Sequence, residues 1–91
     1  MKKMKIKPGY LLREVAGSTV AIPLGDGSVN FNGMITLSET GALLWKKLEN
    51  GATEDELVAA MLEEYDIDDA IARRDIKAFT EKLLKAGILE E

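Results

Sequence analysis

The alternation of apolar and polar positions divides the chain into a first part made of short strands and a second part made of helices. Residues 10–16 and 19–24 each predict a strand, and the apolar side chains of the second recur at the period of two that lines one face of a sheet. Gly17–Ser18 between them predicts a two-residue hairpin turn, since glycine readily takes a positive φ. Residues 34–37, the run MITL, predict a third strand.

Three helices follow, each preceded by a polar residue that favours a helix start. Ser38 is the expected N-cap of the first, which ends near Asn50. Thr53 with Glu56 three residues later is a capping box for the second. Asp68 is the expected N-cap of the third, which ends at Ala86. The loop GDGSVNFNG between the second and third strands is expected to tuck Val29 and Phe31 back into the core.

Helical spacing then predicts which side chains face the core. In chain order these are Gly41, Leu44, Trp45 and Leu48; Leu57, Val58, Met61, Leu62 and Tyr65; and Ala72, Ile76, Phe79, Leu83 and Ala86. Together these elements predict an α+β fold of the winged helix-turn-helix kind, with a three-stranded antiparallel N-terminal sheet followed by three helices. We expect one domain over residues 10–91, after a flexible basic N-terminus over residues 1–9.

The amino-acid composition excludes several kinds of catalytic and metal-binding site. The chain has no cysteine and no histidine, which excludes disulfides, thiolate metal sites and Cys–His or Ser–His catalysis. The acidic groups Glu54–Glu56 and Asp66–Asp69 are expected to be helix N-terminal charge, so we predict no enzyme, no metal and no cofactor. The net charge of −4 disfavours nucleic acid as the main partner. No stretch has membrane-spanning length, and we expect a cytoplasmic protein.

The third strand presents an open question. Met34, Ile35, Thr36 and Leu37 include none of the charged or proline residues that usually protect a sheet edge from pairing. In one interpretation these side chains fill the core, and a loop or a partner in a homodimer covers the edge. In the other, the edge is open for an added strand from a bound peptide. The residues by themselves leave both interpretations standing.

The motifs LSETGALLWKKLENG, EEYDID and KLLKAGILEE resemble the PqqD-like family, over about Tyr10 to Leu89. The family commonly has Asn at the position of Ser38, and both residues are strong N-caps. The resemblance implies a non-catalytic peptide-recognition element for ribosomally made, post-translationally modified peptides. Such a domain binds the leader of a precursor peptide as a strand beside the third strand and against the third helix. It presents the leader to a modifying enzyme, often a radical S-adenosylmethionine enzyme.

Under this resemblance the peptide-binding residues are expected on two elements. The third strand would contribute Met34 to Leu37. The third helix would contribute the stripe next to its core positions, namely Arg73, Lys77, Thr80 and Leu84, with the Arg74 and Lys85 side as the alternative. Two other functions remain as rivals: a DNA-binding regulator that uses the basic residues of the third helix, and a structural subunit of a modifying enzyme.

Overall fold

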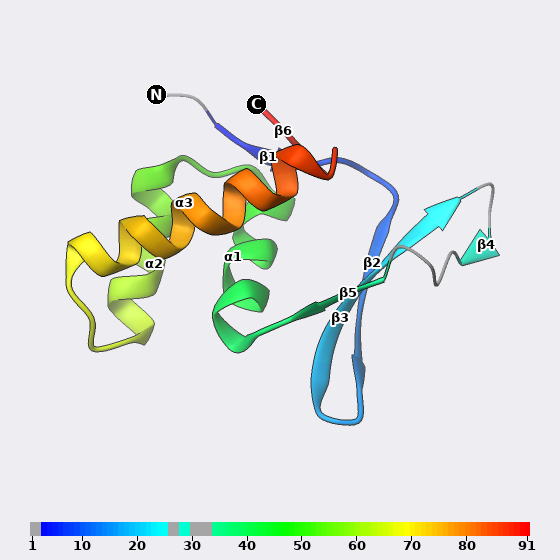
Figure 1. Cartoon of the computed structure of the whole chain (residues 1–91), viewed down its shortest axis with the longest axis horizontal. Coiled ribbons are helices and arrows are strands. Elements are labelled where there is room, and N and C mark those ends of the chain that lie inside the picture. The colour runs from blue at the N-terminus through cyan, green and yellow to red at the C-terminus, as the bar shows by residue number, and fades with distance from the viewer. Residues whose placement is uncertain (1–2, 26–27, 30–33) are drawn as a thin grey trace. The chain divides into compact units, whose positions relative to one another are not determined.

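The computed structural model describes residues 3–25, 28–29 and 34–91, and Figure 1 traces the chain. The chain forms two compact units: one comprises Pro8–Ala42, and the other comprises Met1–Lys7 together with Leu43–Glu91. We call them the sheet unit and the helical unit. Of the helices among the described residues, none combines the length and the apolar character that crossing a membrane requires.

The sheet unit is built around β3 (Ser18–Gly25), the longest strand. It pairs antiparallel with β2 (Tyr10–Val15), with the two-residue β4 (Ser28–Val29) and with β5 (Ile35–Leu37). Figure 1 shows β5 running beside β3 and leading directly into a helix. The three antiparallel strands expected from the sequence are therefore β2, β3 and β5. The remaining strand of this unit, β4, lies in the segment predicted as a loop. We expected Val29 and Phe31 to tuck into the core, but the side chain of Val29 and the whole of Phe31 lie outside the described part of the chain.

The hairpin between β2 and β3 turns one residue earlier than expected. Its central residues are Ala16 and Gly17, with φ of 52° and 83°, and Ser18 is already the first residue of β3. Positive φ at both central residues is the type I′ geometry, whose twist matches that of the flanking strands. The prediction of Gly17–Ser18 was wrong because the turn requires glycine at its second central position, which places Ala16 in a conformation that residues other than glycine seldom adopt.

Three α-helices follow β5: α1 (Glu39–Glu49), α2 (Glu54–Glu64) and α3 (Asp69–Lys85). The expected caps are confirmed. The backbone N–H of Gly41 donates to Ser38 Oγ at 3.0 Å, and the N–H of Ile71 donates to Asp68 Oδ1 at 2.8 Å. Both bonds of the capping box between Thr53 and Glu56 are present. The expected α+β fold, with its N-terminal sheet and three helices, is thus confirmed.

The helical unit has a core of side chains that are almost completely buried. The largest are Trp45, Leu44, Leu48, Leu57, Met61, Ile76 and Leu83. Four residues that were expected in the core are not fully buried: Leu62 and Ala86 are exposed, and Tyr65 and Phe79 are half-buried. In their place α2 buries Ala60 and α3 buries Thr80. The hydroxyl of Thr80 donates to the carbonyl of Lys77, so this polar side chain enters the core without losing its hydrogen bond.

The N-terminal segment, residues 3–7, belongs to the helical unit. We had expected residues 1–9 to be flexible. Strand β1 (Lys5–Ile6) pairs antiparallel with β6 (Leu89–Glu90), and Ile6 is buried. Met4 and Ala52 exchange two backbone hydrogen bonds of 2.8 and 2.9 Å. The first part of the chain therefore joins the α1–α2 connection to the C-terminal strand. A single domain over residues 10–91 stays a prediction.

The C-terminal end of α3 turns as its glycine suggested. The N–H of Ile88 donates to the carbonyl of Leu83 at 2.9 Å, and the N–H of Gly87 donates to Leu84 at 3.1 Å. These two bonds are those of a Schellman motif, and Ile88 and Leu89 are buried as it reverses the chain. This reversal directs β6 toward its pairing with β1.

Candidate peptide-binding site

Strand β5 is an edge of the sheet, because among the described residues it pairs only with β3. Its residues lie opposite Thr19, Val20 and Ala21, with Thr36 opposite Val20. A strand with one unpaired side presents backbone N–H and C=O groups to any chain that approaches in an extended conformation. How strongly β5 can do so depends on which of its residues point outward.

The hairpin turn determines the direction of the backbone groups in β3. Val15 and Ser18 flank the two-residue turn, and residues in this position form a hydrogen-bonded pair. Because backbone groups alternate sides along a strand, the even-numbered residues of β3 point toward β2. The N–H of Leu24 donates to the carbonyl of Gly9 at 2.6 Å, on the β2 side, which agrees with this alternation.

The odd-numbered residues of β3 consequently point toward β5. Thr19 and Ala21 form the hydrogen-bonded pairs with Leu37 and Ile35. Thr36, between them, turns its N–H and C=O away from β3 toward the free edge. Thr36 is therefore the residue of β5 whose backbone is placed to pair with an added strand.

The side chains of the predicted run differ in exposure. Leu37 is buried and Ile35 is half-buried, so these two contribute to the packing of the chain. Thr36 is exposed, and so is Met34, which precedes β5 and keeps 45% of its surface accessible. The run thus combines an outward backbone position with a large exposed apolar side chain beside it.

The other edge of the sheet is protected against such pairing. Strand β2 carries the exposed, charged side chains of Arg13 and Glu14, and charges on an edge strand discourage the addition of another strand. Residues 34–37 carry no charge. Of the two edges, β5 is the one whose chemistry favours a bound peptide.

The stripe expected on α3 consists of Arg73, Lys77, Thr80 and Leu84. Some of these side chains hold the helical unit together, and the others are exposed and could contact a peptide. Arg73 belongs to the first group. Its guanidinium contacts Asp69 at 2.8 Å, Glu54 at 3.0 Å and Asp55 at 3.1 Å, which links the first turns of α2 and α3. The hydrogen bond to Asp69 is the main cause that raises the pKa of Arg73, followed by the one to Asp55. Arg73 therefore stays charged at any physiological pH.

The remaining stripe residues have different environments. Thr80 is buried in the core of the helical unit, whereas Lys77 and Leu84 are exposed. On the alternative side, Arg74 and Lys85 are exposed, and Arg74 has one contact with a carboxylate, to Asp75 at 3.7 Å. The strand residues lie in the sheet unit and the α3 residues in the helical unit. That the two sets form one site stays a prediction.

A family model and two solved structures are similar to the chain. Residues 12–89 match the family model described as coenzyme PQQ synthesis protein D (PqqD). No curated protein matches the chain. One similar solved structure is TbiB1 in complex with the TbiA(beta) leader peptide, with 27% identity, a TM-score of 0.74 and 94% of each chain covered.

A second similar structure is lasso peptide synthetase B1 complexed with the leader peptide. It shares 20% identity and a TM-score of 0.74, and the alignment covers 97% of this chain and 98% of that one. At this identity the likeness shows the fold alone. Since the family model matches most of its length and confirms the resemblance carried by its motifs, this chain belongs to the PqqD family, whose members are non-catalytic peptide-binding domains.

Proposed function

We propose that this chain captures the leader of a ribosomally made precursor peptide by adding it as a strand to β5. The observation that carries the proposal is the unprotected edge, where the backbone of Thr36 points outward and no charged residue lies between Met34 and Leu37. The leader peptide bound by TbiB1 supports the same kind of ligand here.

The proposal includes a second contact and a partner. On α3, Lys77 and Leu84 are the exposed members of the expected stripe and would contact the leader. Arg73 is paired with carboxylates of the helical unit, and Thr80 is buried in its core. An added leader would become ordered on binding and be presented to a peptide-modifying enzyme. A radical S-adenosylmethionine enzyme is the class that the family resemblance favours. A pull-down of the chain with a candidate enzyme of that class, with and without leader peptide, tests it.

Proline scanning of β5 tests the strand addition. Thr36→Pro removes the outward N–H and obstructs the free edge, and should lower leader affinity about tenfold or more with little change in thermal stability. Thr36→Val, which keeps the backbone donor, is the matched control and should bind the leader like the native chain.

Ile35→Pro distinguishes the two sides of the strand. Its N–H points toward β3, so this variant should lose thermal stability through the broken pairing with Ala21. Calorimetric titration of leader and thermal unfolding of the three variants are the measurements. Native-like leader affinity in a folded Thr36→Pro variant would remove β5 as the binding edge.

A further inference from the structure

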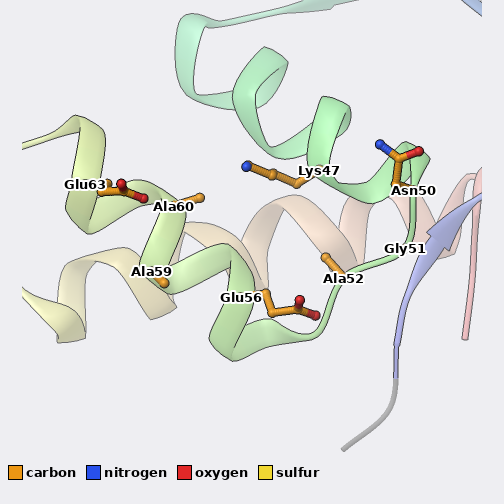
Figure 2. A pocket seen from close by; sticks show the side chains of 8 residues that line it. All are labelled: Lys47, Asn50, Gly51, Ala52, Glu56, Ala59, Ala60 and Glu63. Carbon is orange, nitrogen blue, oxygen red and sulfur yellow. The ribbon is translucent and has the colours of Figure 1, made fainter.

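The groove between the end of α1 and the outer side of α2, within the helical unit, has its charges offset from inside the chain (Figure 2). Lys47 on α1 lies across from Glu63 on α2, and the carboxylate of Glu56 accepts the backbone N–H of Thr53 at 2.8 Å. The free edge of β5 differs from this groove, because β3 is its only strand partner among the described residues. Its outward backbone groups are therefore left for a second chain.

The free edge of β5 is complementary to itself. Thr36 is the middle residue of the strand, and its backbone N–H and C=O point outward. If two such edges meet antiparallel about a two-fold axis at Thr36, the two threonines exchange both N–H···O=C bonds. Ile35 of each copy then lies opposite Leu37 of the other copy, so both chains are paired in the same way.

The side chains of β5 favour this register. Threonines that lie directly opposite each other stabilise an antiparallel pair. Ile35 is half-buried in the single chain, and contact with Leu37 of the other copy would cover more of its apolar surface. Residues 34–37 carry no charge, so no like charges from this segment meet at the axis. Pairing of β5 with itself therefore combines hydrogen bonds and apolar contact without repulsion between the strands.

Association through β5 would stop at two copies. Strand β2 lies on the other side of β3, so joining two sheets through β5 leaves a β2 strand at each outer edge. The exposed charges of Arg13 and Glu14 discourage the addition of a further strand to β2. A contact that uses the same patch of both copies closes into a dimer.

We propose that β5 also pairs with β5 of a second copy of this chain, and that the leader displaces that copy. The inference rests on the proposed function, because both ligands use the outward backbone of Thr36. Three residues from each copy bury much less than the roughly 1,200 Å² of a stable interface, so the dimer is weak and forms at high protein concentration. Self-pairing thus covers the unprotected edge when no leader is bound.

Self-pairing makes the apparent affinity for leader depend on protein concentration. The leader binds the monomer alone, so its apparent dissociation constant equals the intrinsic value divided by the monomeric fraction. This constant should rise about twofold at the concentration where half of the chains are monomeric. Sedimentation velocity of the full chain over a wide concentration range measures the monomeric fraction. Titration of leader into dilute and concentrated samples measures the affinity.

Charges introduced at position 36 test the register. Thr36→Lys and Thr36→Glu each place like charges opposite each other at the axis, so either variant alone should stay monomeric where the native chain dimerises. A mixture of the two variants should associate, because opposite charges then face each other. Val15→Lys is the matched control, since it adds a charge at an exposed position of β2 and should dimerise like the native chain. Thermal unfolding confirms that each variant folds.

A native chain that stays monomeric at every concentration would overturn the inference. A mixture of the two charged variants that fails to associate, or an equal loss of dimer in Val15→Lys, would do the same. So would a dimer that persists at saturating leader, because the edge is then not shared. If the chain binds leader but never dimerises, self-pairing alone is refuted. If it dimerises through position 36 but does not bind leader, the proposed function is refuted and the self-pairing stands.

Discussion

Ser38, Thr53 and Asp68 each accept the backbone N–H of the residue three positions later, and each begins a helix. These bonds are made within four consecutive residues, so they depend on little beyond the local sequence. Arg73 shows the opposite case. It was expected to contact a bound peptide, yet its guanidinium is held by Glu54 and Asp55, which lie 19 and 18 residues before it.

The capping carboxylate of Glu56 should make stability depend on pH. The hydrogen bond from the backbone N–H of Thr53 lowers the pKa of Glu56 in the folded chain. The ionised carboxylate therefore stabilises the fold above the ordinary pKa of glutamate, and this stabilisation is lost as the pH falls through the lowered pKa of the folded chain. Glu56→Gln keeps a capping acceptor without the charge. The difference in the free energy of unfolding between the native chain and Glu56→Gln should therefore shrink between neutral pH and about pH 3.

Urea unfolding at the two pH values measures this difference. Glu64→Gln provides the comparison, since Glu64 lies at the far end of the same helix and makes no capping bond. An equal dependence on pH in both variants would show that the capping box contributes no linked protonation.

At the scale of elements, β5 and α3 differ in how much of their surface remains for a partner. Strand β5 has one whole edge without a strand partner among the described residues. The core residues of α3 lie between two flanks of the helix. On one flank Arg73 forms ion pairs with α2, and on the other lies the half-buried Phe79. Lys77 lies near the Arg73 side of the helix and Lys82, nine positions after Arg73, on the opposite side.

Matched charge reversals decide which flank of α3 meets the leader. Lys77→Glu should lower leader affinity about fivefold at low salt and less at high salt. The reason is that an ion pair between Lys77 and an acidic residue of the leader would be exposed to solvent and screened by salt. Lys82→Glu should leave the affinity unchanged. Titration of leader at two salt concentrations measures both, with thermal unfolding to confirm that each variant folds. If the effect appears only in Lys82→Glu, the peptide lies along the flank of Phe79.

At the scale of the molecule, the N-terminal segment is part of the packing. Ile6 is buried, and its strand joins β6 to the connection between α1 and α2. Ile6→Ala should lower the free energy of unfolding by about 2–4 kcal/mol, as expected for truncating a buried isoleucine. Lys5→Ala, on the exposed side of the same strand, should change it by less than about 0.5 kcal/mol. Equal, small changes in chemical denaturation would return the segment to the flexible terminus that was expected.

Much of the site depended on tertiary structure. The third strand and its lack of charge were visible in the sequence, but the outward direction of Thr36 follows from the turn at Ala16–Gly17 and the pairing with β3. Helical spacing placed Phe79 in the core and Thr80 outside it, whereas the structure buries Thr80. Which flank of a helix is buried depends on the helices packed against it, and a threonine that satisfies its own hydroxyl can take a core position.

The sequence by itself determined the helices, their caps, the order of strands before helices and the family, because each depends on residues close together in the chain or on motifs that keep their spacing. Only the tertiary structure decided the pairing of β1 with β6 and the ion pairs of Arg73 with Glu54 and Asp55. Each of these joins segments that are distant in sequence. Short strands of two residues carry almost no pattern of their own, and they form because the packed helices hold the two ends of the chain side by side.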